Sequence, residues 1–369
     1  AMTTVNHALG TQSDDSREVA GMPDLWSYYT GLGVRVGVLD TGVWSEHPDL
    51  QQAIVSGAPD TDGHGTAVCG VIASRGEVEL NSEHNGSGAA PNADLYVIQR
   101  PSSMTPSQFA GFLSTFSSNS CEIANNSWGL EGSTTYDGFC LALDQWVRNG
   151  GVAVFSSGND PDPESMPSPA IARNAITVGA VSFVPENGSN VVLASYSGRG
   201  PTEDGRLKPE ILAPGGEYYQ TTMQYGVATT NGFYGGSWLD DPSNRWPGEP
   251  SYTRRTGTSM SAAFVSGAMA ICREKYGVLF HSEDAMALMV ACAIPLKGTG
   301  GTAANGYADS QHGFGLLDGY HLPGTYFSEE VDRPLWINAN IQEGQPAREW
   351  VLYVPAYTSW ISTGLGYSD

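Results

Sequence analysis

The sequence predicts an α/β fold in three layers, in which a mostly parallel sheet carries helices on both of its faces. Two observations lead to this prediction. Short apolar runs of strand length alternate along the chain with longer segments of helical character. Polar side chains stand where several of the apolar runs end, and ligands bind at the carboxyl ends of strands in open α/β sheets.

The alternation starts at residues 34–39, an apolar run that we expect to be a buried strand ending at Asp40. A helix of small residues is expected at 65–74, with His64 at its start. A long helix at 259–276 contains many Ala and Gly residues, so it can be buried and closely packed. The other expected strands are 95–99, 123–127, 152–156 and 176–181, and the other expected helices are 107–116 and 136–148.

Composition limits the class of protein. The chain has 369 residues, of which 40% are hydrophobic, so it can bury one large core or form two domains. No apolar run approaches the 18 residues of a membrane-spanning helix. The net charge of −22 argues against nucleic acid and anionic membranes as partners. The same charge suits cationic substrates, although an acidic solvated surface explains it equally well.

Three short runs supply an acid, a base and a hydroxyl nucleophile. Asp40 ends the first apolar run, His64 opens the first helix, and Ser259 lies in a glycine-flanked run before the long helix. A serine hydroxyl needs a base to take its proton, and that base needs an acceptor to fix its tautomer. One candidate is therefore present for each role.

The order Asp, His, Ser along the chain is the subtilisin order, whereas α/β-hydrolases place Ser first and chymotrypsin-like enzymes place His first. Over roughly residues 20–320 the chain resembles the subtilisin-like serine proteases, the subtilases of peptidase family S8. The motifs that carry the resemblance are Asp40-Thr41-Gly42-Val43, His47-Pro48-Asp49-Leu50, His64-Gly65-Thr66, Ala90-Pro91-Asn92-Ala93, Ser127-Trp128-Gly129, Ser157-Gly158-Asn159, Gly200-Pro201-Thr202 and Gly257-Thr258-Ser259-Met260.

This resemblance implies a subtilisin-like three-layer fold and a serine endopeptidase. Asp40, His64 and Ser259 would form the catalytic triad, and the Asn159 side chain would donate to the oxyanion together with the Ser259 N–H. Peptide substrates would pair with Ser127, Trp128 and Gly129 and with a segment near residues 102–105. The pocket for the residue before the scissile bond (P1) would be walled by Ser156, Ser157 and Gly158.

Asp160, Asp162 and Glu164 come directly after these pocket residues in the sequence. Acidic side chains that line the pocket would favour a basic P1 residue, although a solvated acidic loop is the competing interpretation. No cofactor is expected for the chemistry. Structural calcium is common among subtilases, but the acidic residues show no spacing from which ligands could be assigned. The five cysteines show neither CxxC nor Cys/His spacing, which argues against a zinc site.

Two departures from the family pattern leave alternatives open. Ala263 and Phe264 stand where subtilases usually carry Pro and His after the nucleophile, and Ala67 stands where the family often has His. A transpeptidase or macrocyclase on the same fold would use the same acyl-enzyme, and an inactive peptide-binding scaffold is a further alternative. An aspartic protease would need a second Asp-Thr/Ser-Gly, and the chain has none.

The expected organisation is a polar arm at 1–20, a catalytic domain at 21–320 and a β-rich extension at 321–369, with a loop insertion at 230–251. The first 20 residues do not resemble a signal peptide, and only 33 residues precede the first strand. Together with an odd number of cysteines, this favours a cytoplasmic enzyme that folds without a prodomain. Such an enzyme would need restraint, for example by an inhibitory protein partner or by the arm.

Overall fold

The computed structural model of the chain describes residues 22–60, 62–79, 85–184, 190–216, 227–228, 245–246, 249–253, 255–277, 282–294, 296, 308–319 and 322. The predicted arm at 1–20 lies outside these residues, as do nearly all of the extension at 321–369 and most of the insertion at 230–251. Within the described part, no helix is long and apolar enough to cross a membrane.

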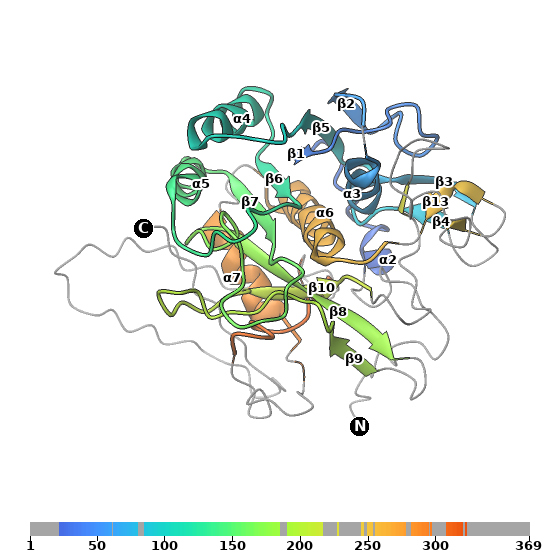
Figure 1. The fold of residues 1–369 in the computed structure, drawn as a ribbon. Coiled ribbons are helices and arrows are strands. Elements are labelled where there is room, and N and C mark those ends of the chain that lie inside the picture. Colours follow the sequence, from blue (N-terminus) through green and yellow to red (C-terminus); the bar gives the residue numbers. More distant parts are fainter. Residues whose placement is uncertain are drawn as a thin grey trace.

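An eight-stranded sheet runs through the centre of the molecule (Figure 1). Its strand order is β10-β8-β7-β6-β1-β5-β2, and β9 pairs with β8. All pairs in this sheet are parallel except β8 with β9. The strands are β1 Arg35–Asp40, β2 Ile54–Gly57, β5 Asp94–Gln99, β6 Ile123–Asn126, β7 Val152–Ser156, β8 Ile176–Val184, β9 Asn190–Leu193 and β10 Ile211–Pro214.

Helices cover both faces of this sheet, which confirms the predicted three-layer α/β fold. One face packs against α3 (His64–Ala73), α6 (Thr258–Tyr276) and α7 (Ser282–Cys292), and the other packs against α4 (Pro106–Ser118) and α5 (Gly138–Arg148). A short helix, α2 (Met22–Leu25), joins the first group. The remaining strands form a hairpin of β3 (Arg75–Glu79) with β4 (Asn85–Ser87), and a small sheet of β11 (Val227–Ala228), β12 (Arg245–Trp246) and β13 (Glu249–Thr253).

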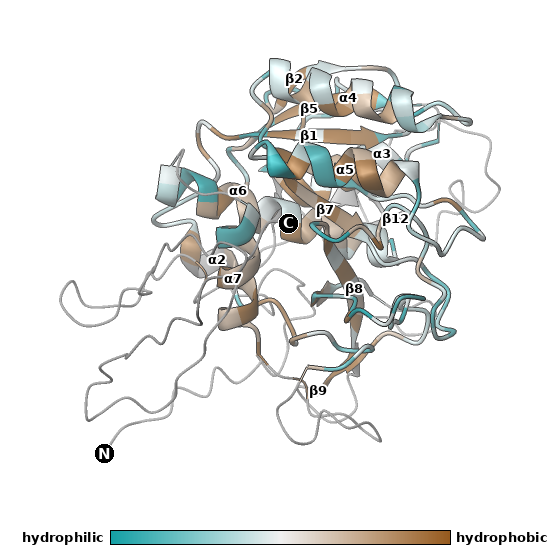
Figure 2. Ribbon diagram, turned by 90° about the vertical axis from the view of Figure 1, so that its left-hand side faces the viewer, coloured by the Kyte–Doolittle hydropathy of each residue, from teal (hydrophilic) through white to brown (hydrophobic). Residues whose placement is uncertain are grey.

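Alternation along the strands separates the two cores. In β7, Val152 and Val154 belong to the core under α3 and α6, whereas Ala153 and Phe155 belong to the core under α4 and α5. Successive side chains of a strand point to opposite faces, so a run that is apolar at every position must be covered on both sides. Figure 2 shows the apolar strands β1 and β7, in brown, lying among the helices.

Helix α6 has the largest number of buried residues among the described helices. Sixteen of its residues, from Thr258 to Arg273, are buried, and its first turn is hydrogen-bonded to Ser127 and Asn159, which follow the carboxyl ends of β6 and β7. Small side chains let neighbouring backbone approach closely: a Cβ at Gly267 would lie 2.6 Å from the Cβ of Ala89. The Ala- and Gly-rich composition that predicted a buried helix is therefore what allows it to pass through the middle of this layer.

Candidate active site

Asp40 and His64 meet at the carboxyl edge of the sheet, because Asp40 is the last residue of β1 and His64 is the first residue of α3. Nδ1 of His64 lies 2.7 Å from Oδ1 of Asp40. Asp40 is only 4% exposed, and the same oxygen accepts the Thr41 N–H at 2.8 Å. An ionised carboxylate only accepts, so the proton resides on Nδ1 and Nε2 is left as the basic nitrogen.

A second buried carboxylate, Asp60, holds the loop that delivers His64. Its two oxygens accept N–H groups of Asp62, Gly63 and Thr66 at 3.0, 2.9 and 2.8 Å, and hydroxyl groups of Thr41 and Thr66 at 2.8 and 2.5 Å. Burial raises the pKa of Asp60, but these hydrogen bonds outweigh it and the net direction is downward. Asp60 was not among the predicted site residues.

The start of α3 packs directly on the turn that follows Asp40. A Cβ at Gly65 would lie 2.1 Å from the Gly42 carbonyl oxygen, and the Gly65 N–H donates to the Thr41 hydroxyl at 2.8 Å. Only glycine fits such a contact. The glycines of the two motifs Asp-Thr-Gly and His-Gly-Thr therefore set how closely acid and base approach each other.

The environment of His64 tunes its proton affinity in two opposing directions. Burial lowers the pKa of the imidazole, whereas the charge of Asp40 and the hydrogen bond to it raise it, and the net direction is upward from about 6.5. The positive charge of Arg255 opposes this rise. The His64 side chain is 29% exposed, so a substrate can reach it.

Ser259 is the second residue of α6 and is linked to the end of β6 by two reciprocal hydrogen bonds. Its hydroxyl donates to the Ser127 carbonyl at 3.2 Å, and the Ser127 hydroxyl donates to the Ser259 carbonyl at 2.9 Å. In this rotamer the Ser259 hydroxyl makes no hydrogen bond to a described imidazole. Catalytic hydrogen bonds are often formed only when substrate binds, so this rotamer does not argue against Ser259 as a candidate nucleophile.

Backbone N–H groups at the start of α6 differ in their partners. The Thr258 N–H donates to Oδ1 of Asn159 at 3.0 Å, and the Met260 N–H donates to the Gly257 carbonyl at 3.0 Å. The Ser259 N–H makes no hydrogen bond to any described residue. The first N–H groups of a helix lack acceptors within the helix and lie at the positive end of its dipole, which suits the Ser259 N–H to an anion.

Asn159 follows β7 and is exposed. The Thr258 hydroxyl also lies 3.0 Å from its Oδ1. Because a backbone N–H can only donate, the Asn159 atom that faces Thr258 must be the carbonyl oxygen, and Nδ2 faces the other way. Asn159 therefore has a fixed orientation that leaves its own donor group available.

The residues predicted to bind peptide lie around the same place. Gly129 and Gly158 both border the Pro167 ring. A Cβ added to Gly129 would lie 2.4 Å from an atom of that ring, and a Cβ added to Gly158 would lie 3.0 Å from one. The segments 127–129 and 156–158 thus come together. Trp128 is 8% exposed and packs edge-on against Phe155. The two glycines are half-buried, and the buried serines of these segments are Ser127, Ser156 and Ser157.

Asp160 lies in an exposed loop with Asp162 and Glu164. Its carboxylate accepts the Asp162 N–H at 3.1 Å, and its carbonyl accepts the Ser165 hydroxyl at 2.6 Å. The Asp160 carboxylate is thus tied into its own turn and solvated, which weakens any influence on a neighbouring pocket.

The residues that depart from the family pattern lie in the core. Ala263 and Phe264 are buried within α6, and Ala67 is buried within α3. Cys69 is also buried, and burial together with the charges of Asp40 and Asp60 raises the pKa of its thiol well above the ordinary value. This thiol therefore stays protonated and cannot compete as a nucleophile.

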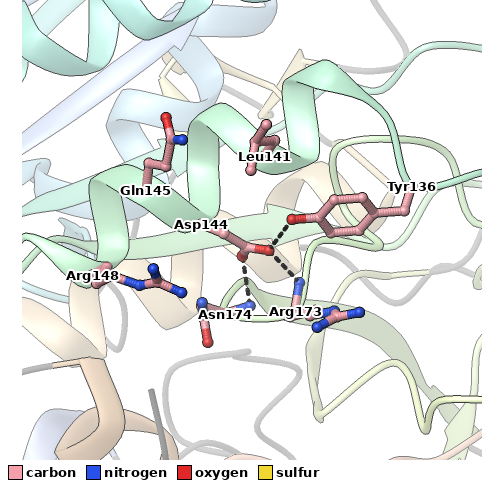
Figure 3. A pocket seen from close by; sticks show the side chains of 7 residues that line it. All are labelled: Tyr136, Leu141, Asp144, Gln145, Arg148, Arg173 and Asn174. Carbon is pink, nitrogen blue, oxygen red and sulfur yellow. Dashed lines mark hydrogen bonds between the residues drawn. The ribbon is translucent and has the colours of Figure 1, made fainter. Parts of the chain in front are cut away.

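Among the described residues, no group of three or more His, Cys, Asp or Glu side chains is placed to hold a metal ion. A separate cavity of about 290 Å³ lies beside α5 (Figure 3). Its floor is Asp144, which accepts the Tyr136 hydroxyl at 2.6 Å and the N–H groups of Arg173 and Asn174 at 3.2 and 2.8 Å. None of the predicted catalytic residues lines it.

Comparisons with known proteins place this geometry in a family. The profile of the subtilase family, peptidase S8, matches residues 31–316. Subtilisin DY of Bacillus licheniformis is 31% identical over 269 residues, which cover 69% of this chain and 82% of the relative. The minor extracellular protease Vpr of Bacillus subtilis is 32% identical over 222 residues, covering 53% of this chain and 26% of the relative.

A solved protease from Pseudoalteromonas arctica superposes with a TM-score of 0.60 at 23% identity, covering 82% of this chain and 93% of the other. At that identity the likeness shows the fold alone. It agrees with the parallel sheet and the two helical layers described above.

The expectation of a cytoplasmic location is wrong, because it conflicts with the similarity to subtilisins and to a protease that is extracellular by name. It depended partly on the unpaired cysteines. In the structure Cys69, Cys121, Cys140 and Cys272 are buried, so they act as small apolar side chains and carry no information about the compartment. The match over residues 31–316 and the identity to subtilisin DY show that the chain belongs to the subtilase family of serine proteases.

Proposed function

We propose that this chain is a serine endopeptidase that cleaves peptide bonds through a Ser259 acyl-enzyme, with His64 as general base and Asp40 as its orienting acid. The observation that carries this proposal is the 2.7 Å bond between Asp40 and Nδ1 of His64, at the same sheet edge where the first turn of α6 holds Ser259. The bond leaves Nε2 free to accept a proton.

In the first step, the Ser259 hydroxyl turns from the Ser127 carbonyl toward Nε2 of His64. Its oxygen attacks the substrate carbonyl carbon while its proton passes to Nε2. The imidazolium that forms is stabilised by the buried Asp40 carboxylate, which stays ionised. His64 then gives the proton to the leaving amine, and the acyl group remains on Ser259.

The negative charge that develops on the substrate oxygen would be bound by two donors. One is the Ser259 N–H, which has no acceptor among the described residues, and the other is Nδ2 of Asn159. Both are fixed before the reaction, the first by α6 and the second by Thr258. Donors that need no reorganisation stabilise the transition state more than the ground state.

Water completes the cycle. His64 takes a proton from the water that attacks the acyl carbonyl, and it returns that proton to Ser259 as the acid product leaves. A transpeptidase would replace this water with an amine. The named relatives are proteases and give no support to transfer or to an inactive scaffold.

Substrates would be polypeptides bound in extended form. Two segments offer backbone groups for strand addition, namely 102–104 and 128–129, and the second directly follows Ser127, which is hydrogen-bonded to Ser259. Their N–H and C=O groups make no hydrogen bond to any described residue. Pairing through the main chain accepts many sequences, and the side-chain pockets then set the preference.

The test compares the wild type with Ser259→Ala on a diverse peptide library, read by mass spectrometry. Loss of roughly 10⁶-fold in turnover with peptide binding retained is expected, as in subtilisin. A fluorophosphonate should label Ser259 in the wild type and fail to label His64→Ala. Products should gain the mass of water. Unchanged turnover in Ser259→Ala would overturn the proposal, and products that join two peptides would replace hydrolysis by transfer.

A further inference from the structure

We infer that Arg100 is a specificity-determining residue that selects substrates with an acidic side chain in the peptide segment held by residues 128–129. The inference rests on the proposed function, since it names a substrate class for that same site. It assigns to Arg100 a direct contact with the substrate carboxylate, at a distance from the bond that is cleaved.

Arg100 is held between the acid of the site and the peptide-binding edge. It directly follows β5, and its N–H donates to the Asp40 carbonyl at 2.6 Å. Its guanidinium lies over the Trp128 ring, with the carbon Cζ 5.4 Å from the ring centroid. Trp128 in turn follows Ser127, whose carbonyl accepts the Ser259 hydroxyl. The positive charge is therefore fixed beside the residues that surround the nucleophile.

The guanidinium has a rigid support. Phe109 and Phe155 pack edge-on against Trp128, with ring centroids 5.4 and 5.6 Å away, and the Trp128 indole N–H donates to the Asn126 side chain at 3.2 Å. These contacts fix the position of the Trp128 ring. Arg100 lies on the ring and donates through Nη1 to the Pro101 carbonyl at 3.2 Å, which uses one of its five N–H donors. The planar guanidinium suits bidentate binding of a carboxylate.

Two backbone segments close to Arg100 have N–H and C=O groups that bind no other described residue. The main-chain groups of Trp128 and Gly129 make no hydrogen bond within the described part of the chain, and neither do those of residues 102–104. Arg100 lies two residues before one of these segments, and its guanidinium lies over the Trp128 ring of the other. An extended peptide that pairs with residues 128–129 would therefore lie next to the residue that carries this half-buried guanidinium on its ring.

The charge of Arg100 stands out against the rest of the protein. The chain carries 39 acidic and 17 basic residues, so its mean field repels acidic peptides. The carboxylate of Asp40, whose carbonyl accepts the Arg100 N–H, is itself engaged by His64 and Thr41. The positive charge of Arg100 can thus attract an acidic side chain at one position of the substrate, while the rest of the protein repels it. Such a local charge provides specificity rather than general affinity.

The experiment measures kcat/KM for matched peptide pairs that differ by Glu against Gln at each of the four positions on either side of the cleaved bond. The wild type should prefer Glu by roughly fivefold at one position, as for a partly exposed ion pair. This preference should shrink between 50 mM and 1 M NaCl because salt screens the pair. Arg100→Met keeps an unbranched side chain next to Trp128 without the charge and should remove the preference, while Arg100→Glu should reverse it in favour of Gln.

Arg148→Met is the matched control, because Arg148 is an exposed arginine on α5 beside the separate cavity (Figure 3). It should leave the Glu to Gln ratio unchanged. If Arg100 only supports Trp128, Arg100→Met will lower kcat/KM equally for every peptide, and that result overturns the inference. A wild-type ratio near one at all positions also overturns it while hydrolysis itself continues. Absence of all cleavage would instead count against the proposed function.

Discussion

The Asn159 side-chain carbonyl accepts both the N–H and the hydroxyl group of Thr258, each at 3.0 Å, across 99 positions of sequence. Because Oδ1 of Asn159 faces Thr258, Nδ2 is the end of the amide that remains available as a donor. This arrangement also couples the loop after β7 to the first turn of α6, so that the start of α6 holds both expected oxyanion donors.

Replacing Asn159 by Leu should therefore lower turnover by about 10²–10³ with little change in KM, as the loss of one oxyanion donor does in subtilisin. Steady-state kinetics on a single peptide checks this. Asn159→Asp keeps an oxygen toward Thr258 but places negative charge near the oxyanion, so it should lose more than the Leu variant. A change confined to KM would make Asn159 a binding residue instead.

The pH profile should report His64. Hydrolysis requires the neutral imidazole, so kcat/KM should rise with pH through a midpoint above about 6.5, the ordinary value for histidine. Asp40→Asn removes the charge that raises this pKa and leaves the burial that lowers it. Its midpoint should fall, and its maximal rate should drop by about 10⁴-fold because the tautomer is no longer fixed.

The contribution of His64 to folding stability should fall as pH rises, whereas kcat/KM should increase. Since folding raises the pKa of His64, the group stabilises the fold fully below its unfolded pKa of about 6.5, and this contribution is lost as pH rises through the folded pKa. The difference in unfolding free energy between wild type and His64→Ala should therefore shrink as pH increases over that window. A wild-type kinetic midpoint clearly below 6.5 would contradict both statements.

Asp60 is expected to position His64 without touching substrate. In Asp60→Asn an NH₂ group must face hydrogen-bond donors such as the Thr66 N–H and hydroxyl. Folding stability should fall by about 1–3 kcal/mol. The turnover number should fall by roughly 10- to 100-fold as the base is misplaced, with the His64 midpoint little changed. Asp62→Asn is the control, because among the described residues its carboxylate accepts one N–H, that of His64 at 3.2 Å, in an exposed bond. Full turnover in Asp60→Asn would exclude a positioning role.

The sequence predicts those parts of the molecule whose signal is local. The run ending at Asp40, the helix start at His64 and the small-residue helix after Ser259 each follow from neighbouring residues, and the structure confirms these elements to within a few residues. The strand β10 was not predicted, since it has four residues and ends in a proline. Helix α7 was missed as well, because its apolar residues show little preference for one face.

The supporting residues of the site could not be predicted in the same way. Thr258 orients Asn159 from 99 positions away, and the role of Asp60 appears only when Thr41, Gly63 and Thr66 surround one carboxylate. An acid four residues before a histidine at a helix start could have suggested such a role, because short polar side chains often satisfy the first N–H groups of a helix. The acidic loop at Asp160 shows a limit of a different kind: its position after Gly158 suggests that it lines the pocket or forms a solvated loop, and the exposure of its side chain could not be read from the sequence.

A basic preference at P1 should accordingly be weak. Asp160 is exposed and held in its own turn, so an ion pair with a substrate Arg contributes about 0.2–1 kcal/mol, equivalent to at most about fivefold in kcat/KM. Asp160→Asn should remove this advantage of an Arg peptide over its norleucine counterpart, and 1 M salt should do the same. A library profile in which large apolar P1 residues dominate and Arg gains nothing would refute the preference.

Asp144 should stabilise the fold independently of catalysis. Its buried carboxylate joins Tyr136 to the turn at Arg173 and Asn174 (Figure 3). In Asp144→Asn the amide can no longer accept all three donors, so a donor is left unsatisfied and the unfolding free energy should fall by about 1–3 kcal/mol. Tyr136→Phe removes one bond from a partly exposed ring and should cost about 0.5–1.5 kcal/mol. Denaturant unfolding measures both, and kcat/KM at low temperature should stay at the wild-type value. An Asp144→Asn variant with the unfolding free energy of the wild type would show that the carboxylate does not stabilise the fold. A folded Asp144→Asn variant with reduced kcat/KM would show that the cavity beside α5 affects the candidate active site.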